Sequence, residues 1–133
     1  MIEKTLSIIK PDAVERNLVD DIKSIFAKNN LSVKDSKKIH ISKEEASEFY
    51  KVHQSKPFYD DLCAYLSSGP IFVMILEGEN AILENRRIMG ATNPKEAGPN
   101  TIRRLYGISI DKNSVHGSDS VPNGKIEIDF FFK

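Results

Sequence analysis

The chain has 133 residues, and its 19 Lys and Arg side chains are balanced by 19 Asp and Glu side chains. This length is typical of one compact domain over residues 1–133, and zero formal net charge excludes the overall positive charge typical of non-specific nucleic-acid binders. Cys63 is the single cysteine, so no disulfide can form within the chain, which favours a reducing compartment. The apolar run near the N-terminus is too short for a signal peptide or a membrane span. We therefore expect a cytoplasmic protein with no membrane partner and no specific nucleic-acid partner.

The N-terminal part of the sequence predicts a strand, a helix and a second strand. The apolar run TLSII (residues 5–9) indicates a buried strand that ends before Pro11, a residue suited to the first turn of a helix. Apolar residues then recur every three or four positions up to Phe26, which predicts one amphipathic helix ending near Asn29. The segment LSVKDSKKIHI (residues 31–41) alternates at both ends, which predicts a strand with one exposed face.

The middle of the chain predicts helices around a central strand. Ser42 and Glu45 have the spacing of a capping box, so a helix is expected through residues 44–54. A short helix, a continuously apolar strand and a helix closed by Gly90 are then expected over residues 57–68, 71–76 and 79–90.

The remaining sequence gives weaker signals. Residues 91–107 are rich in Pro, Gly and Asn and form a long connection of the kind that often carries function, and residues 108–117 show a weak strand signal. In VPNGKIEIDFFF (residues 121–132), apolar and polar residues alternate after a turn-like Asn123-Gly124 pair, which favours a strand on pattern alone. Strands separated by helices predict a sheet with helices packed on it, but they do not fix the order of the strands.

The histidine in NSVHGSDS (residues 113–120) is the first candidate for chemistry. A neutral imidazole is a good nucleophile near neutral pH, and Gly117 after His116 would leave room for a large group to approach. The alternative is an ordinary loop histidine in a turn, since a single histidine is weak support for catalysis. The other two histidines are expected at the surface, His40 in the alternating strand and His53 late in a helix.

Five cationic side chains are candidates for binding an anion: Lys10, Arg86, Arg87, Arg103 and Arg104. Lys10 stands where a strand gives way to a helix, and the guanidinium fork of arginine suits a phosphate group. Adjacent residues point in different directions, so at most one member of each arginine pair should face a common site. The alternative for any one arginine is a solvated helix face.

Other residues near these candidates could have either role. Glu127 could orient the imidazole of His116 through the nitrogen that does not react, or it could be a surface carboxylate. Tyr50 and Phe58 could belong to the core, although Phe49 fits the core face of its helix better than Tyr50. The sequence has neither a P-loop nor the glycine-rich loop of protein kinases, so a nucleotide site must be of another type.

Several motifs taken together identify a family. The segments KPDAV, SGPIFVMILEGENAI, MGATNP, TIRR and NSVHGSDS closely resemble those of nucleoside diphosphate kinases, and the resemblance runs from about Thr5 to the final IEIDFFF. It implies a ferredoxin-like α/β (α+β) sandwich, with a four-stranded antiparallel sheet covered by helices on one face, plus a helical hairpin and a loop. It also implies transfer of the terminal phosphate of a nucleoside triphosphate to a nucleoside diphosphate, by a ping-pong mechanism through a phosphohistidine.

The same resemblance assigns roles to individual residues. His116 matches the nucleophile, and Glu127 matches the carboxylate that hydrogen-bonds its other ring nitrogen. Ser118 matches a hydroxyl that assists Glu127 and the transferred group, and Lys10 is expected to serve both catalysis and binding. The phosphate-contacting residues of the family match Lys10, Tyr50, Arg86, Thr92 and Arg103.

The ribose and the base are expected to contact other residues. Asn113, together with Lys10, matches the contacts to the ribose hydroxyls. Phe58 and Ile110 match the apolar pair that holds the base, with Leu62 close by. A base held by its flat faces is poorly distinguished from other bases, so low base selectivity is implied.

The resemblance also implies a metal ion and an assembly. Mg²⁺ would arrive on the nucleotide phosphates with no direct protein ligand, and Asp119 would reach it at most through water. Members of the family assemble as homo-oligomers, and the sequence leaves open whether this chain forms a tetramer or a hexamer.

The sequence departs from the family pattern at a few positions. Asn100 replaces the usual glycine before Thr-Ile-Arg, Arg104 replaces a Gly or Lys after it, and Asn17 and Asp20 stand where glycines are common. PNGK (residues 122–125) replaces good helix formers, and a glycine inside a helix costs about 1 kcal/mol relative to alanine. We nevertheless expect the family's helix in this segment, because the first turn of a helix tolerates proline.

Two other functions compete with the enzyme. A catalytically silent relative could act as a regulatory binding module, which the complete set of motif residues disfavours. A ferredoxin-like nucleic-acid binder is disfavoured by the neutral charge and by the lack of the aromatic sequence typical of RNA-recognition motifs.

Overall fold

The computed structural model of the protein describes residues 2–51, 54–110 and 112–132. Its centre is an antiparallel four-stranded sheet, as expected, with the strand order β2-β3-β1-β4. The strands are β1 (Ile2–Ile9), β2 (Ser32–Ile39), β3 (Ile71–Glu79) and β4 (Val115–Gly117). The α-helices in the described residues are α1 (Pro11–Glu15), α2 (Val19–Lys28), α3 (Lys43–Phe49), α4 (Tyr59–Leu66), α5 (Ala81–Met89), α6 (Ile102–Tyr106) and α7 (Val121–Phe132). None of these helices is long and apolar enough to cross a membrane.

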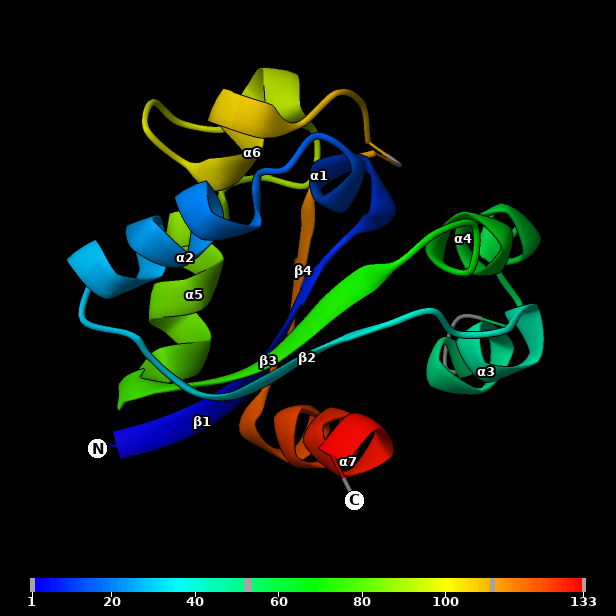
Figure 1. Cartoon of the computed structure of the whole chain (residues 1–133), viewed down its shortest axis with the longest axis horizontal. Helices are drawn as coiled ribbons and strands as arrows, with labels where there is room; N and C mark the ends of the chain where they lie inside the picture. Colours follow the sequence, from blue (N-terminus) through cyan, green and yellow to red (C-terminus); the bar gives the residue numbers. More distant parts are fainter. Residues whose placement is uncertain (1, 52–53, 111, 133) are drawn as a thin grey trace.

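Helices cover both faces of the sheet because β1 is apolar on both faces. Successive side chains of a strand point to opposite faces, so Ile9 joins one core while Leu6 and Ile8 join the other. Figure 1 shows α2 and α5 on one side of the sheet and α7 on the other. The expectation of helices on one face was therefore incomplete, since Leu6 and Ile8 also have to be shielded from water.

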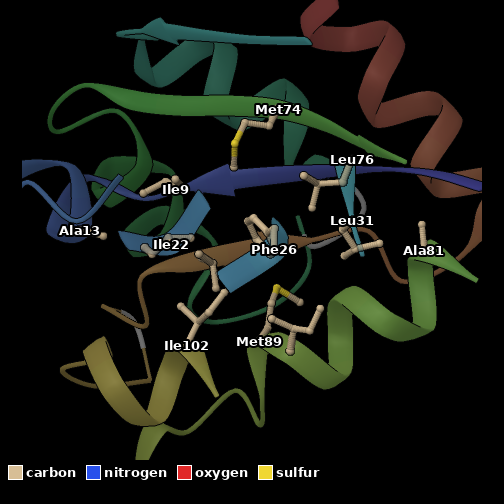
Figure 2. Packing of buried hydrophobic residues seen from close by; sticks show 12 residues of the cluster. Ile9, Ala13, Ile22, Phe26, Leu31, Met74, Leu76, Ala81, Met89 and Ile102 are labelled. Atoms are coloured by element: carbon tan, nitrogen blue, oxygen red, sulfur yellow. The ribbon is translucent and has the colours of Figure 1, made fainter. Parts of the chain in front are cut away.

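The first core packs α2 and α5 against the sheet. Figure 2 shows Phe26 of α2 between Met74 of β3 and Met89 of α5, and all three side chains are buried. Burial of a side chain of this size contributes about 1.5–3 kcal/mol each. This packing holds α5 beneath β4, the strand that contains His116.

The second core lies on the face of the sheet to which His116 points. Ile8 pairs directly with His116 across β1 and β4, and residues that are directly opposite in an antiparallel pair share a face. Ile8 packs in this core with Tyr50 of the α3 C-cap and Phe131 of α7. The histidine is therefore placed among side chains from α3 and α7.

The helix expected from Pro11 to about Asn29 is two helices, α1 and α2. Asn17, between them, has a φ of 58°, in the left-handed region that interrupts a right-handed helix. Asparagine tolerates this conformation better than most residues with a side chain. This explains why asparagine can replace the usual glycine here, and Asn100, with a φ of 66°, provides a second example.

Other boundaries differ from the expectations by a few residues or more. The capping box at Ser42 and Glu45 is confirmed, but α3 ends at Phe49, and His53 of the expected helix lies outside the described residues. The connection at residues 91–107 contains a 3₁₀-helix, η2 (Pro94–Glu96), and α6. The weak strand signal at residues 108–117 corresponds to a strand over the last three positions alone.

The C-terminal segment is a helix, so the expectation from the family is confirmed and the alternating pattern was misleading. Ser120 precedes the helix, and its Oγ accepts a hydrogen bond from the Asn123 N–H at 3.2 Å. Gly124 N–H donates to the Ser120 carbonyl at 2.8 Å and so completes the first turn. A serine cap and a proline near the start are both compatible with helix initiation.

Candidate active site

His116 lies on β4 and is oriented by a carboxylate from α7. The Nε2 atom of His116 is 3.1 Å from Oε1 of Glu127. An ionised carboxylate can only accept hydrogen bonds, so the histidine nitrogen that faces it has to be the donor. This contact therefore favours the tautomer in which Nε2 carries the hydrogen and Nδ1 keeps its lone pair. The ring centroid of Phe49 lies 5.4 Å from that of His116 in an edge-on arrangement, which further limits rotation of the imidazole.

Ser118 fixes the carboxylate in turn. The Ser118 Oγ donates to the same Glu127 oxygen at 2.7 Å and accepts from the Leu6 N–H at 3.2 Å. Ser118 is fully buried, so its hydroxyl is anchored between the sheet and α7. Two donors thus converge on one oxygen of Glu127 and hold it beside the ring of His116.

Gly124 lies on the buried side of α7, near Ser118. Gly124 is buried, and a Cβ at this position would lie 3.4 Å from Ile82 and 3.5 Å from Ser118. These are ordinary van der Waals distances, so a methyl group would fit here and the packing of α7 does not require glycine.

Lys10 and Asn113 form a buried hydrogen-bonded pair next to β4, the strand that contains His116. Lys10 Nζ donates to Asn113 Oδ1 at 2.9 Å, and both residues are buried. Asn113 Nδ2 donates to the backbone carbonyl of Thr92 at 3.1 Å. The pair therefore connects the end of β1, the connection after α5 and the segment before β4.

Arg103 is a buried cation held by two neutral carbonyls. Its Nη1 donates to the Gly90 carbonyl at 3.0 Å and its Nη2 to the Val115 carbonyl at 2.9 Å. Its Nε has no hydrogen-bond partner within residues 2–51, 54–110 and 112–132. Burial, followed by the charge of Arg86, lowers the pKa of Arg103 to about 10, so the side chain is still charged at neutral pH. A cation in this state is suited to an incoming anion.

The two adjacent arginine pairs separate as expected. Arg104 is exposed and donates to the Lys95 carbonyl, and Arg87 forms a surface ion pair with Glu84 at 3.0 Å. Arg86 is exposed on α5, and its charge lowers the pKa values of both Arg103 and Asp119. Arg103 and Arg86 are therefore the members that share one electrostatic environment.

Tyr50 is a buried neighbour of the histidine. It is 4% exposed, and its ring centroid is 6.4 Å from that of His116. Burial, with the charge of Glu127, raises the pKa of Tyr50 well above its usual range, so its hydroxyl stays protonated. His40, by contrast, is exposed and contacts the Ser67 carbonyl, which confirms its expected surface position.

Most of the side chains expected to contact the base, and Thr92, are more exposed than His116 and its partners. Phe58 and Ile110 are 46% and 55% exposed, and Leu62 is half-buried on α4. Thr92 is also exposed, and it is the Thr92 backbone that contacts Asn113. The structure therefore joins the predicted residues in two hydrogen-bonded pairs, His116 with Glu127 and Lys10 with Asn113. The side chains expected to contact the base face solvent.

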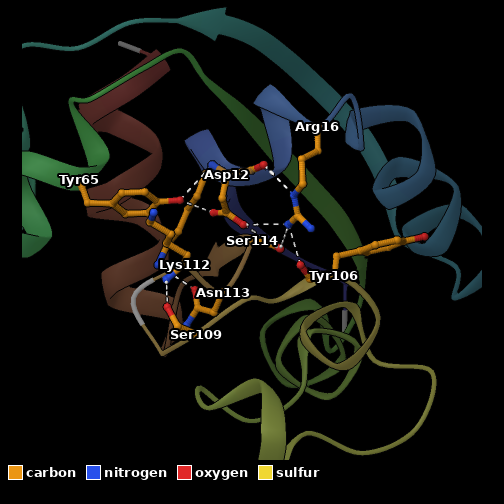
Figure 3. Close-up of polar contacts among 9 residues, drawn as sticks. Asp12, Arg16, Tyr65, Tyr106, Ser109, Lys112, Asn113 and Ser114 are labelled. Atoms are coloured by element: carbon orange, nitrogen blue, oxygen red, sulfur yellow. Dashed lines mark hydrogen bonds and ion pairs between the residues drawn. The ribbon is translucent and has the colours of Figure 1, made fainter.

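Gly117 has a different role from the one expected. A Cβ on Gly117 would lie 2.8 Å from Cε of Met89, in the space occupied by α5. The missing side chain makes room for the helix behind β4, whereas the sequence suggested room for a substrate. The sequence also gave no signal for a hydrogen-bond cluster of Asp12, Tyr65 and Ser114 (Figure 3).

The donor set of the site suits phosphate better than a bare metal ion. Within the described residues, no group of three or more His, Cys, Asp or Glu side chains is placed to hold a metal. Asp119 is an exposed carboxylate whose pKa is lowered, chiefly by a hydrogen bond from Asn123. Lys10, Arg86 and Arg103 instead supply positive charge, which fits a cation that arrives on an anionic ligand.

Comparisons with known proteins point to one family. The family described as "Nucleoside diphosphate kinase" matches residues 3–133. A nucleoside diphosphate kinase of Campylobacter lari is 56% identical over 98% of this chain and 96% of its own, and one of Nitrosococcus oceani is 54% identical over 100% and 93%. The crystal structure of the Aquifex aeolicus nucleoside diphosphate kinase superposes with a TM-score of 0.98 at 40% identity, covering 100% of this chain and 96% of that one. These matches confirm the ferredoxin-like fold class.

Proposed function

Because the chain belongs to the nucleoside diphosphate kinase family, we propose that residues 1–133 act as one domain that transfers the terminal phosphate of a nucleoside triphosphate to a nucleoside diphosphate. The observation that carries this proposal is the contact between His116 Nε2 and Glu127, which leaves Nδ1 as the nucleophile. A histidine oriented in this way beside buried cations is suited to attack a phosphate.

The reaction then proceeds in two displacements at phosphorus. The lone pair of His116 Nδ1 attacks the terminal phosphorus, and the bond from that phosphorus to the bridging oxygen breaks, so the nucleoside diphosphate leaves with the electron pair. An oxygen of the second nucleoside diphosphate attacks the phosphohistidine, and the P–N bond breaks to return the lone pair to Nδ1. Glu127 stabilises the ring while it carries positive charge, because Nε2–H points at the carboxylate.

Lys10, Arg86 and Arg103 stabilise negative charge on the phosphate oxygens, with Tyr50 and Thr92 as further contacts. Phosphoryl transfer depends largely on positioning and on such charge. Mg²⁺ bound to the nucleotide phosphates would supply additional neutralisation, with Asp119 contributing at most through water. Asn113 and Lys10 contact the ribose.

Phe58 and Ile110 hold the base by its faces, with Leu62 beside them. Phe58 and Ile110 are large apolar side chains that are about half exposed. Every base has a flat face, so contacts of this kind give low base selectivity. Exposed Ile2, Leu83 and Ile126 elsewhere on the surface support assembly as a homo-oligomer, a tetramer or a hexamer.

The test is covalent labelling by the terminal phosphate of ATP with Mg²⁺ alone. We expect the wild-type protein to take up label that is lost in acid and kept in base. His116→Ala should abolish it, whereas His40→Ala, at an exposed histidine, should retain it. Labelling of a folded His116→Ala variant would overturn the nucleophile assignment. A wild-type protein that binds nucleotide but takes up no label would favour a regulatory module.

A further inference from the structure

A hydrogen-bond cluster around the buried residues Asp12 and Ser114 lies beside the Lys10–Asn113 pair, and the proposed reaction does not use it. Its centre is Asp12, in the first turn of α1, with a side chain 3% exposed. The Tyr65 hydroxyl, from α4, donates to Asp12 Oδ1 and accepts from the Asp12 N–H, the latter at 2.9 Å. Figure 3 shows Tyr65 and Arg16 approaching Asp12 from opposite sides.

The second oxygen of Asp12 holds the segment in front of β4. Ser114 Oγ and Arg16 Nη2 each donate to Asp12 Oδ2 at 3.1 Å. The Ser114 carbonyl accepts from the Lys10 N–H at 2.8 Å, and Lys10 Nζ reaches Asn113. Lys10, Asp12, Ser114 and Asn113 therefore form a closed ring of chain connections and hydrogen bonds.

Ser114 is held in a conformation that it would rarely adopt without this ring. Its φ is +75°, in the left-handed region, and it is fully buried. Such a backbone persists only where its surroundings hold it in place. Burial, followed by the hydrogen bond to Asp12, raises the pKa of Tyr65 beyond its usual range, so the phenol remains a donor at any working pH. The cluster thus fixes the residue next to Asn113.

We propose that Tyr65 is a positioning residue for ribose recognition, holding the Lys10–Asn113 pair through Asp12 and Ser114. The proposal rests on the proposed function, because the ribose contact of this pair is part of that function. A merely structural role, in which Tyr65 ties α4 to α1, would change stability without changing the preference for a ribose that carries its hydroxyls. That preference is therefore the quantity to measure.

The experiment compares the dissociation constants of ADP and 2′,3′-dideoxy-ADP, with Mg²⁺, by calorimetry on the full chain. The wild-type protein should prefer ADP. Tyr65→Phe should reduce that preference about fivefold, the loss expected for one well-placed hydrogen bond. Tyr59→Phe is the matched control, since the Tyr59 hydroxyl, on the same helix, donates to the Ser47 carbonyl at 2.8 Å. It should leave the preference unchanged.

Ser114→Gly gives a second route to the same answer. Glycine adopts the observed φ without strain, so this variant removes only the hydroxyl. It should also reduce the preference for ADP over 2′,3′-dideoxy-ADP. An unchanged preference in folded Tyr65→Phe and Ser114→Gly would overturn the proposal, and if Tyr65→Phe does not fold, Ser114→Gly decides. A wild-type protein that lacks any preference for ADP would also overturn it. A wild-type protein that prefers ADP but transfers no phosphate would refute the proposed function alone.

Discussion

The histidine end and the base end of the site are built in different ways. At the histidine end, Ser118 and Glu127 hold His116 through hydrogen bonds of 2.7 and 3.1 Å, from elements packed on the sheet. At the proposed base end, Phe58 and Ile110 are about half exposed and lie outside the strands and helices. Directional contacts fix a reacting atom, whereas exposed apolar surfaces hold a ligand without reading its edges. The difference matches a chemistry that is strict about phosphate and tolerant of the base.

The largest effect is expected from Arg103→Ala, at the histidine end. Loss of the buried charge should slow phosphohistidine formation by about a thousandfold. The Gly90 and Val115 carbonyls lose their donors, which should lower the free energy of unfolding by about 2 kcal/mol. Rapid-quench labelling and urea unfolding measure the two losses. Arg104→Ala, at an exposed neighbour, is the control, and equal losses in both variants would contradict the role of Arg103.

Glu127→Gln should slow phosphohistidine formation by about a hundredfold. The amide can still accept from His116 and Ser118, but it cannot stabilise positive charge on the ring. The free energy of unfolding should therefore change by less than about 1 kcal/mol. Labelling measures the rate of phosphohistidine formation, and thermal unfolding measures the change in stability. A wild-type rate in the variant would mean that Glu127 only places the ring and that its charge is unimportant.

Phe58→Ala should have a smaller effect, at the base end. Loss of one stacking surface should lower kcat/KM by about tenfold. The loss should be similar for adenine, guanine, cytosine and uracil nucleotides, because the ring contacts a face that all of them have. Steady-state rates with the four triphosphates provide the measurement, and Leu105→Ala, at an exposed apolar residue of α6, is the control. A loss confined to one base would show that this end reads base edges.

The smallest expected effect is the contribution of Asp119 to the stability of the protein as the pH falls. Its pKa lies below the ordinary value of 3.8, chiefly because Asn123 donates to it. A lowered pKa in the folded protein contributes stability above the ordinary value and loses it as pH falls through the lower one. Because Asp119 is exposed, the contribution should be below about 0.5 kcal/mol. Urea unfolding of the wild type and Asp119→Asn should differ least in acid; a difference that grows on acidification would contradict this.

The sequence predicted elements better where local signals agreed with tertiary packing. The buried run of β1 and the capping box of α3 were found directly. The split between α1 and α2 was missed because the apolar spacing continues across Asn17, whose left-handed backbone alone separates the helices. In α7 the alternating pattern favoured a strand, because local sequence does not show that Phe131 of this helix packs into the second core.

For the site, the sequence alone identified residue types but could not place them together. Glu127 was a candidate partner of His116 by residue type, with a surface carboxylate as the alternative, and the structure then brought the two side chains into contact. Tyr65 was missed because its partner, Asp12, is far away in the chain and becomes adjacent only in the folded protein. The chemical roles of these residues stay predictions until the variants are measured.

The site also has a consequence for how the chain folds. The hydrogen bond between Leu6 and Ser118 joins residues 112 positions apart, and that between Lys10 and Asn113 spans 103 positions. Contacts of such long range form slowly, because the entropy of closing the intervening loop must be lost first. A refolding chain can therefore be compact around β2 and β3 while β4 is still undocked. Enzymatic competence would then return with the last strand to join the sheet, later than most of the secondary structure.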